Sequence, residues 1–271
     1  MKKISKIIYS IIAVALVLGI IGLTAGAVLG ARPSEFLSIN WKGIHLNLNL
    51  GEDNLLLEGE IAGKKQGGSF LSEEIDSLKI SMGRGAMNIL PSEDNTVIYY
   101  EGQGRFSCEQ KGKTLVIKDN GFDASTPIEL YLPRKVFEQV EVELGAGRMD
   151  IADLSADRLK IELGLGSLEA EHLEAIQELE VQVGAGRFWA NSCIGKKIDL
   201  ECGVGSIELT LAGKETDYDY TLECGIGNIS YGNRMLSGLG KEKKIDNQAE
   251  WKINAECGMG QIDIDFLENT E

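Results

Sequence analysis

A pair of glycines separated by one residue recurs along this chain, each time between two short strands of alternating apolar residues. The seven pairs are Gly83/Gly85, Gly145/Gly147, Gly164/Gly166, Gly184/Gly186, Gly203/Gly205, Gly225/Gly227 and Gly258/Gly260. From Gly145 onward, the first four steps between pairs are 19, 20, 19 and 22 residues. This period is too short for a repeat of two helices. It suits one coil of a β-solenoid, in which each coil packs only against its neighbours.

The segment Leu159–Ala170 (LKIELGLGSLEA) shows the pattern of one coil, with apolar and polar residues alternating on both sides of the glycines. Alternation with a period of two predicts a strand that is buried on one face. Glycines at the corner permit unusual φ angles and a close approach of neighbouring coils. The same template fits Leu78–Ile89, Val140–Ile151, Leu179–Ala190, Ile198–Leu209, Tyr220–Tyr231 and Trp251–Ile264.

The 60 residues between Gly85 and Gly145 span about three further periods, and a degenerate pair, Gly102/Gly104, lies there. We expect coils with altered corners in this region. Their predicted strands are Val97–Tyr100, Thr114–Lys118 and Ile128–Leu132. The predicted fold class is therefore all-β, a single β-solenoid of the β-helix or β-roll kind. It would have about nine coils of about 20 residues each, from Asp76 to Phe266.

The N-terminus carries three lysines within the first six residues, followed by an apolar run from Ile7 to Leu29. As a helix, this run is long enough to cross a hydrocarbon layer of ~30 Å, and the lysines indicate a cytoplasmic end. We therefore predict a single-pass transmembrane anchor in residues 1–33, with the rest of the chain extracytoplasmic. A cleaved signal peptide, with Ala25–Ala27 as the cleavage site, is the alternative.

Two further segments complete the predicted organisation. Residues 34–75 are expected to form a stalk or an N-terminal cap, because the end of a stack needs cover for its apolar face. Residues 76–271 are expected to form the solenoid domain. Within it, Gly238–Glu250 is a polar insertion at a corner before the last coil, where functional variation is expected.

The formal net charge of −15 over 271 residues argues against a nucleic-acid partner. Binding to phosphates needs clustered Lys and Arg side chains that release counterions. Direct binding of the main domain to an anionic lipid surface is disfavoured for the same reason. The charge keeps a large β surface soluble, or it suits a cationic partner such as an amine-bearing polymer or a divalent ion.

Stacking of the coils predicts a row of acidic side chains on the outside of one sheet, each two residues before a glycine. Its members are Glu143, Glu162, Gln182, Glu201, Glu223 and Glu256. Calcium binds several carboxylate oxygens, so Glu143, Glu162, Glu201, Glu223 and Glu256 are the candidate metal ligands. Calcium-binding β-rolls use G-G-x-G-x-D, however, and the corners here lack that aspartate. We therefore favour a solvated acidic face over a calcium site, and predict no cofactor.

Three of the five cysteines, Cys202, Cys224 and Cys257, directly precede a glycine pair, where other coils carry leucine or valine. We interpret them as small core residues, because free cysteine is among the most buried residue types. A zinc site is the alternative, but no CxxC motif or nearby histidine supports it. The two histidines, His45 and His172, have no ligand or catalytic pattern around them.

Catalytic motifs are missing from the sequence. The glycine pairs lack the third glycine and the following helix of a dinucleotide fingerprint. Ser167 and Ser206 follow glycine pairs without completing a G-x-S-x-G elbow. We therefore predict that the protein is not an enzyme.

A lysine-flanked membrane segment followed by coils such as VEVELGAGRMDI, LKIELGLGSLEA and IDLECGVGSIEL resembles the bacterial putative-adhesin family. That family is a domain of unknown function that is expected to form a β-solenoid on bacterial cell surfaces. The resemblance covers roughly two thirds of the chain, from Asp76 to Phe266. It implies a non-enzymatic, surface-displayed interaction module and brings no catalytic residue with it.

We therefore expect a membrane-anchored module that binds a cell-envelope polymer or a membrane protein. The alternative is an accessory or sensory subunit of a membrane or envelope-stress system that acts through its transmembrane helix. Gly22 and Gly26 in that helix are spaced as G-x-x-x-G, a weak signal for helix dimerisation.

Overall fold

The computed structural model describes residues 37–41, 44–48, 66–103, 106–119 and 126–267. The chain divides into two compact units, Met1–Ile61 and Ala62–Glu271. In the first unit, strands β1 (Leu37–Trp41) and β2 (Ile44–Leu48) pair antiparallel. The predicted anchor, Ile7–Leu29, lies outside the described residues. Within the described ranges, no helix has the length and hydrophobicity that a membrane crossing requires.

The second unit consists almost entirely of strands, which confirms the predicted all-β class. Its first strands are β3 (Gln66–Leu71), β4 (Ser77–Met82), β5 (Ala86–Pro91), β6 (Val97–Gly102), β7 (Phe106–Lys111), β8 (Thr114–Asp119), β9 (Ile128–Leu132) and β10 (Val136–Leu144). Three long strands follow, β11 (Arg148–Leu163), β12 (Ser167–Val183) and β13 (Arg187–Cys202). The last are β14 (Ser206–Ala212), β15 (Tyr218–Cys224), β16 (Asn228–Tyr231), β17 (Arg234–Ser237), β18 (Lys241–Ile245), β19 (Trp251–Cys257) and β20 (Gln261–Leu267). Two single 3-10 turns, η1 (Ser72–Glu74) and η2 (Glu215–Asp217), lie between strands.

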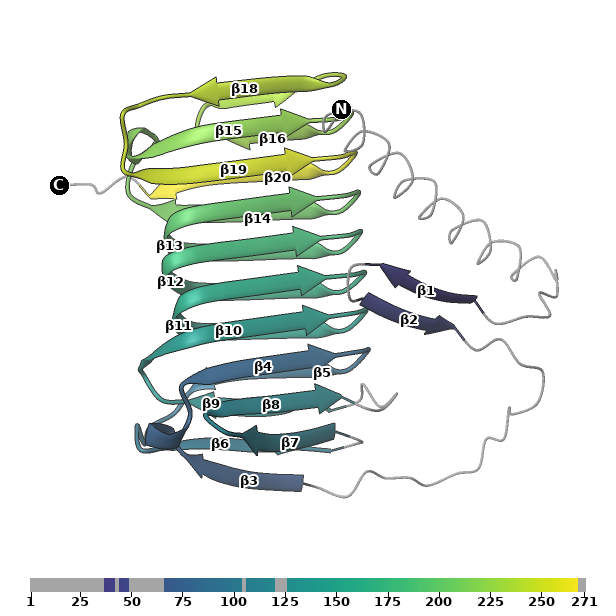
Figure 1. Ribbon diagram of the computed structural model, residues 1–271, viewed down its shortest axis with the longest axis vertical. Helices are drawn as coiled ribbons and strands as arrows, with labels where there is room; N and C mark the ends of the chain where they lie inside the picture. The colour runs from purple at the N-terminus through teal and green to yellow at the C-terminus, as the bar shows by residue number, and fades with distance from the viewer. Residues whose placement is uncertain (1–36, 42–43, 49–65, 104–105, 120–125, 268–271) are drawn as a thin grey trace. The chain divides into compact units, whose positions relative to one another are not determined.

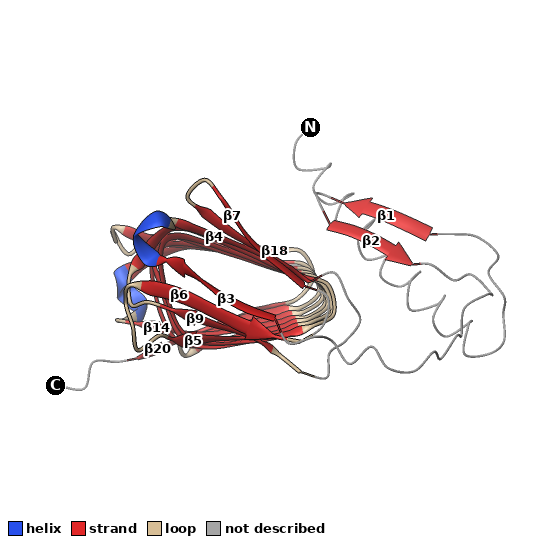
Figure 2. Cartoon of the chain, turned by 90° about the horizontal axis from the view of Figure 1, so that it is seen from below, coloured by secondary structure: helices blue, strands red, loops and turns tan. Residues whose placement is uncertain are grey.

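The strands of this unit form two layers that enclose one core (Figures 1 and 2). In order of pairing, the first layer contains β7, β8, β4, β10, the C-terminal parts of β11, β12 and β13, then β19, β15 and β18. The second contains β3, β6, β9, β5, the N-terminal parts of β11, β12 and β13, then β14, β20, β16 and β17. We use the word coil for two strands, one in each layer, that a glycine pair joins.

Neighbouring coils pair in parallel, so that equivalent residues lie beside each other. Val140 is paired with Leu159, and Val142 with Ile161. All four side chains are at most 1% exposed. The long strands continue from the second layer back to the first through a back corner, where the register of pairing shifts. The alternating pattern therefore turns one side chain in two toward a continuous apolar core, as expected for strands with one buried face.

The coils stack in an order that differs from their order in the sequence. The last coil, β19 and β20, lies between the coil of β13 and β14 and the coil of β15 and β16. Likewise, the coil of β4 and β5 is enclosed by β8 and β9 on one side and by β10 and β11 on the other. Both edges of each enclosed coil are hydrogen-bonded. Antiparallel strands then close the two ends of the stack.

The expected coils between Gly85 and Gly145 are only partly correct. The predicted strands exist, as β6, β8 and β9, and β8 and β9 pair in parallel with the coil above them. However, β6 runs antiparallel to β3 and β9, and β7 runs antiparallel to β8. The segment therefore builds hairpins at the end of the stack instead of three further coils. Residue 104 of the degenerate pair lies outside the described residues.

The corner glycines are required by the close approach of neighbouring coils. A Cβ atom added to Gly145 would lie 2.7 Å from the carbonyl oxygen of Gly83, and one added to Gly147 would overlap the carbonyl oxygen of Gly85. The expectation of unusual φ angles is wrong here, because the described glycines with positive φ all lie outside the seven pairs. The corners pack so tightly because their amides continue the hydrogen bonds of the sheets: the N–H of Ala146 donates to the oxygen of Gly83 at 2.7 Å.

At the corner of β4 and β5, a side chain accepts backbone N–H groups. The carboxylate of Asp119, at the end of β8, accepts hydrogen bonds from the N–H groups of Arg84 at 3.4 Å and Gly85 at 3.0 Å. A carboxylate that accepts backbone N–H groups makes a charge-assisted hydrogen bond, which is stronger than a neutral one.

One buried tyrosine in the core lacks a hydrogen-bond partner among the described residues. Tyr218 is fully buried, and its ring packs on those of Trp251 and Phe266 at centroid distances of 5.4 and 6.0 Å. Tyr220, two residues further along β15, is 2% exposed but donates to the carbonyl oxygen of Glu215 at 2.7 Å. Burial raises the pKa of both hydroxyls, which therefore stay protonated.

The corner geometry predicts that an added methyl group destabilises the protein at one glycine and has little effect at another. Gly147→Ala is expected to lower the free energy of unfolding by about 2–3 kcal/mol, because the new Cβ overlaps the carbonyl oxygen of the coil below. Gly83→Ala is the matched control, since nothing lies within 4 Å of its added Cβ. It should change stability by no more than about 0.5 kcal/mol. Urea denaturation followed by circular dichroism measures both, and equal losses would refute this explanation.

The two tyrosines predict a second pair of differing effects. Tyr218→Phe removes a buried hydroxyl without a partner and should leave stability unchanged or raise it by about 1 kcal/mol. Tyr220→Phe removes a satisfied hydroxyl and should lower stability by about 1 kcal/mol. The midpoints of urea denaturation of the two variants test this difference. A loss at Tyr218 as large as that at Tyr220 would mean that its hydroxyl has a partner.

Candidate functional site

The back corner that the long strands form is missing at the level of β5. Strand β5 leaves the stack at Pro91 toward β6, so its coil has no back corner like those within β11, β12 and β13. Instead, the short segment Pro133–Lys135 joins β9 to β10 across this level, because β9 pairs with β5 whereas β10 pairs with β4 and β11. The interruption leaves a cavity of about 210 Å³ between this link and the middle of β11.

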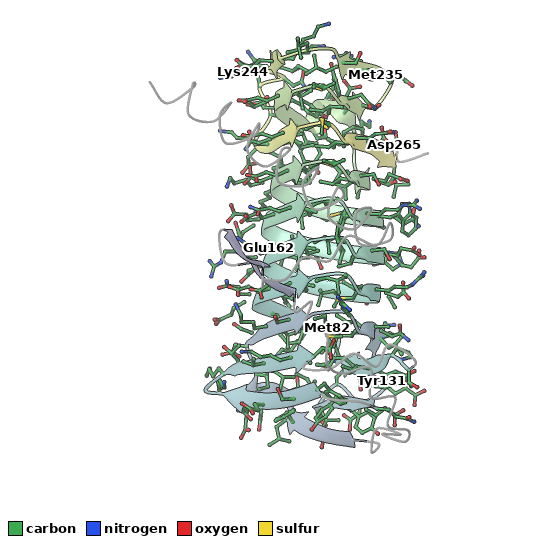
Figure 3. All side chains as sticks on the ribbon, turned by 90° about the vertical axis from the view of Figure 1, so that its right-hand side faces the viewer. Met82, Tyr131, Glu162, Met235, Lys244 and Asp265 are labelled. Atoms are coloured by element: carbon green, nitrogen blue, oxygen red, sulfur yellow. The ribbon has the colours of Figure 1, made fainter. Side chains whose placement is uncertain are left out.

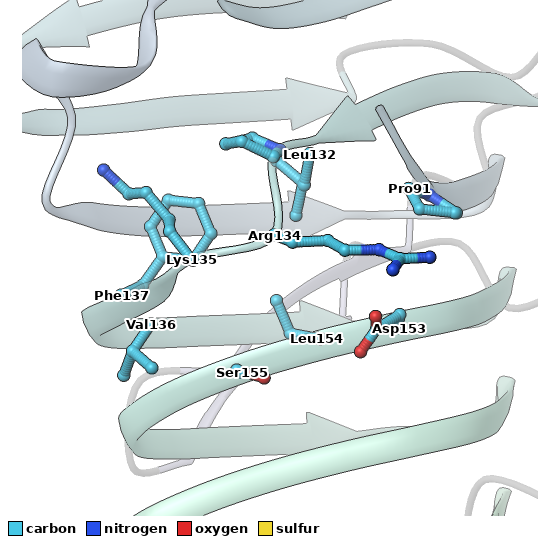
Figure 4. A pocket seen from close by; sticks show the side chains of 10 residues that line it. Pro91, Leu132, Arg134, Lys135, Val136, Phe137, Asp153, Leu154 and Ser155 are labelled. Carbon is cyan, nitrogen blue, oxygen red and sulfur yellow. The ribbon is translucent and has the colours of Figure 1, made fainter. Parts of the chain in front are cut away.

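We call this space the link cavity (Figure 4). Its lining residues come from the ends of β5 and β9, the link, the start of β10 and the middle of β11: Pro91, Leu132, Pro133, Arg134, Lys135, Val136, Phe137, Asp153, Leu154 and Ser155. Leu132, Phe137 and Leu154 belong to the apolar core and are at most 3% exposed. Val136, at the rim, is 45% exposed. The cavity thus combines an apolar floor with charged and polar side chains.

The link that carries Arg134 is held at several points. The N–H of Arg134 donates to the Oδ1 atom of Asn95 at 3.0 Å. The ammonium group of Lys135 donates to the carbonyl oxygens of Ser72, at 2.6 Å, and Ile75, and lies 5.0 Å from the centroid of the Phe137 ring. Burial lowers the pKa of Lys135. Lys135 therefore fastens the link, and Arg134 is the cation that the link offers to the cavity.

The opposite wall of the cavity is the strand β11. Asp153 pairs in register with His172 of β12, and Ser155 donates from its hydroxyl to the Oε2 atom of Glu174 at 3.0 Å. Strand β5 pairs with β11 only as far as Ile151, so the outer side of Asp153 faces the cavity instead of another strand. The sheet thereby positions a carboxylate on a rigid strand across from the guanidinium group of Arg134.

A second hollow of about 270 Å³ lies near the other end of the stack. It is lined by Asp219, Tyr220, Thr221, Lys244, Ile245, Asp246, Lys252 and Asn254. Its carboxylate at Asp219 already accepts the backbone N–H groups of Asn247 and Ala249, at 2.8 and 3.1 Å. Asn254 in turn donates to Asp199 at 2.6 Å. This hollow falls in part on the predicted insertion Gly238–Glu250, whose polar groups hold the loop in place.

The acidic row predicted from the sequence lies on the first layer (Figure 3, where Glu162 is labelled). Register pairs Glu143 with Glu162, Glu162 with Gln182 and Gln182 with Glu201. Beyond Glu201 the order differs from the expected one: Glu256 comes next, then Glu223 and finally Glu242 of β18. We call these residues the glutamate row. With the last coil enclosed, four consecutive strands of the first layer carry glutamates: Glu201 on β13, Glu256 on β19, Glu223 on β15 and Glu242 on β18.

Lysines in the adjacent row offset part of this charge. Lys160 lies 3.0 Å from Glu162 and 3.1 Å from Glu180, and Lys79 lies 2.6 Å from Glu141 and 3.5 Å from Glu143. The hydrogen bond from Lys79 to Glu141 raises the pKa of Lys79. The row is thus an ordered array of charges on a flat sheet.

The three corner cysteines stack in the core, as the sequence predicted. Cys257 pairs in register with Cys202 on one side and with Cys224 on the other, and each is 3% exposed. The thiols of Cys202 and Cys224 donate to the carbonyl oxygens of Gly205 and Gly227, at 3.0 and 2.9 Å.

The described residues contain no cluster of three or more His, Cys, Asp or Glu side chains arranged to hold a metal ion. The calcium and zinc alternatives thus gain no support from the geometry of that part of the chain. Of the two cysteines outside the corner register, Cys193 is fully buried and Cys108 is half-buried. Burial raises the pKa of each thiol to about 12, so both stay protonated at neutral pH.

The glutamate row, apart from Glu242, was predicted from the sequence, but the link cavity was not. Arg134 and Asp153 lie in different elements, 19 residues apart, and neither belongs to a motif. Two signals were available. Pro91 and Pro133 mark places where strands of the sheet end. The segment from Gly85 to Gly145 was also the one stretch without regular corners.

Several solved structures align with the chain. A putative cell adhesion protein from Clostridium sporogenes aligns over 76% of this chain and 100% of its own, with 16% identity and a TM-score of 0.43. A putative adhesin from Parabacteroides distasonis aligns over 74% and 97%, with 13% identity and a TM-score of 0.37. A putative adhesin from Parabacteroides merdae aligns over 74% and 96%, with 11% identity and a TM-score of 0.34.

No family model and no curated protein matches the chain. The solved structures that align with it are bacterial proteins named as a putative cell adhesion protein and as putative adhesins.

Proposed function

We propose that the protein is a non-enzymatic, extracytoplasmic β-solenoid that binds an amine-bearing polymer of the bacterial cell envelope. The segment Ile7–Leu29 would hold it at the cell membrane as a single-pass anchor. The observation that carries the proposal is the glutamate row, a line of carboxylates at the fixed spacing of paired strands. Neighbouring strands in a sheet are about 4.8 Å apart.

A repeating array of charges suits a repeating partner. Successive cationic groups of an extended polymer can meet successive carboxylates, and each added contact makes the next one intramolecular. Complementary charge also speeds encounter and selects against partners of the wrong sign. The net charge of −15 favours cationic partners in the same way.

The binding surface is preorganised. The side chains of the glutamate row stand on strands that are hydrogen-bonded on both sides, from β10 through β15. Ordering this surface on binding therefore has a low entropic cost, because the backbone that carries it is already fixed. A solvated row of charges can bind a partner. It is not the enclosed, water-excluding site that most catalysis needs.

The proposal predicts that neutralising part of the glutamate row weakens binding to cell envelopes. The variant Glu162→Gln, Glu201→Gln, Glu223→Gln removes three charges and introduces the residue that the row already carries at Gln182. The full chain in lipid nanodiscs is mixed with isolated bacterial envelopes and sedimented at low speed, at two salt concentrations and with or without calcium. The native chain should pellet saturably at low salt. The affinity of the variant for the envelopes should be lower by a factor of at least about five.

The matched control removes the same charge from the opposite layer. Glu169→Gln, Glu208→Gln and Asp263→Asn lie on β12, β14 and β20, in a row of the second layer. This variant should bind like the native chain, so that an equal loss in both variants would indicate a nonspecific effect of net charge. A native chain that stays wholly in the supernatant would contradict the proposal and direct attention to partners of the N-terminal segment.

A further inference from the structure

The link cavity presents two opposite charges that do not neutralise each other. Arg134 and Asp153 both line it, from the link and from β11. Within the described ranges, neither side chain forms an ion pair or a hydrogen bond, with the other or with any third group. By contrast, Lys160 and Arg148 on the surface of the stack pair with carboxylates at about 3 Å.

A cavity with this charge pattern selects for ligands that carry both signs. A simple anion that approaches Arg134 is repelled by Asp153, and a simple cation that approaches Asp153 is repelled by Arg134. A zwitterion satisfies both groups at once. Discrimination of this kind comes as much from the repulsive group as from the attractive one.

The floor and size of the cavity narrow the ligand further. Val136, which is 45% exposed, offers apolar surface at the rim, while Leu132 and Leu154 are almost fully buried and close the floor. An apolar side chain of the ligand would gain about 25 cal/mol for each Å² of its surface removed from water. A volume of about 210 Å³ corresponds to a molecule of small size. At roughly 30 Å³ for a water-sized group, that is on the order of ten non-hydrogen atoms or fewer.

We propose that the link cavity binds a free α-amino acid with an apolar side chain. The guanidinium group of Arg134 receives the carboxylate, for which its planar arrangement of N–H groups allows two parallel hydrogen bonds. The carboxylate of Asp153 receives the ammonium group, and the side chain packs against Val136 over the floor that Leu132 and Leu154 close (Figure 4). This site is separate from the glutamate row and does not depend on the proposed binding to envelopes.

The wall that carries Arg134 is ready for binding. Pro133 restricts the backbone of the link, the N–H of Arg134 bonds to Asn95, and Lys135 bonds to two carbonyl oxygens. Asp153 lies on a strand that is paired with β12. Little backbone has to be ordered when the ligand enters, which favours measurable affinity for a small molecule.

The test uses the full chain in lipid nanodiscs and L-leucine as the probe, with empty nanodiscs as the blank. Ligand-observed NMR should detect binding with a Kd of about 1 mM, a typical affinity for a ligand of this size. Two analogues carry one charge each: 4-methylpentanoate has only the carboxylate, and 3-methylbutylamine only the ammonium group. Each should bind at least about tenfold more weakly than leucine, because one wall of the cavity then repels it or stays unpaired.

Two single variants locate the site. Arg134→Gln and Asp153→Asn should each weaken leucine binding at least about tenfold. Arg158→Gln and Asp157→Asn are the matched controls, because they change the same residue types on β11 outside the cavity lining and should bind leucine like the native chain. Thermal melts by circular dichroism verify that all four variants are folded.

Several outcomes would overturn the proposal. One is the lack of any leucine signal with the native chain at about 20 mM, well above the expected Kd. Another is equal binding of leucine and its two analogues, which would indicate apolar contact alone. A third is unchanged binding in both Arg134→Gln and Asp153→Asn, which would place leucine elsewhere.

Discussion

The contact between a corner glycine and the carbonyl oxygen of the neighbouring coil sets the geometry of the whole stack. At Gly147 even a methyl group would overlap the oxygen of Gly85, so that the corner leaves room only for hydrogen. This lets the corners come as close as the strands, and the hydrogen bonds of the two layers continue through the turn. Because the corners fix the register, the strand residues on both sides of a glycine pair lie beside their equivalents in the next coil.

Register controls the outer surface as strictly as the core. Inside, it stacks leucine on leucine and cysteine on cysteine; outside, it stacks glutamates that would repel each other, with lysines of the adjacent row beside them. The surface is therefore an array whose spacing belongs to the backbone. The link cavity arises where this regularity ends. The coil of β4 and β5 lacks a back corner, and the link at that level carries Arg134 to the edge of the core.

Much of this architecture was predictable, because the glycine pairs and the alternation of apolar residues are local signals. They located the strands of the coils, the three corner cysteines and the members of the glutamate row other than Glu242. They did not give the order of the coils, since Cys257 fits beside Cys202 as well as Cys224 does, and identical patterns cannot rank their neighbours. For the corner glycines, the close approach of the coils was predicted correctly and the unusual φ angles were not. Both requirements select glycine, so the sequence alone does not distinguish them. Arg134 and Asp153 line the same cavity because the link Pro133–Lys135 crosses at this level, and the link is not part of any repeat.

The enclosed position of the last coil has a consequence for how the chain folds. A stack in sequence order could grow one coil at a time as the polypeptide leaves the ribosome. Here β15 and β16 are made before β19 and β20, yet they find their parallel partners only in those later strands. Until residue 267 has been synthesised, the edge of β13 and β14 stays open and the preceding coil has nothing to dock on. Closure of this end is therefore a late, non-local step, and topology of that kind slows folding. The same holds at the other end of the stack, where β4 pairs with β8 on one side and β10 on the other, and both are synthesised later.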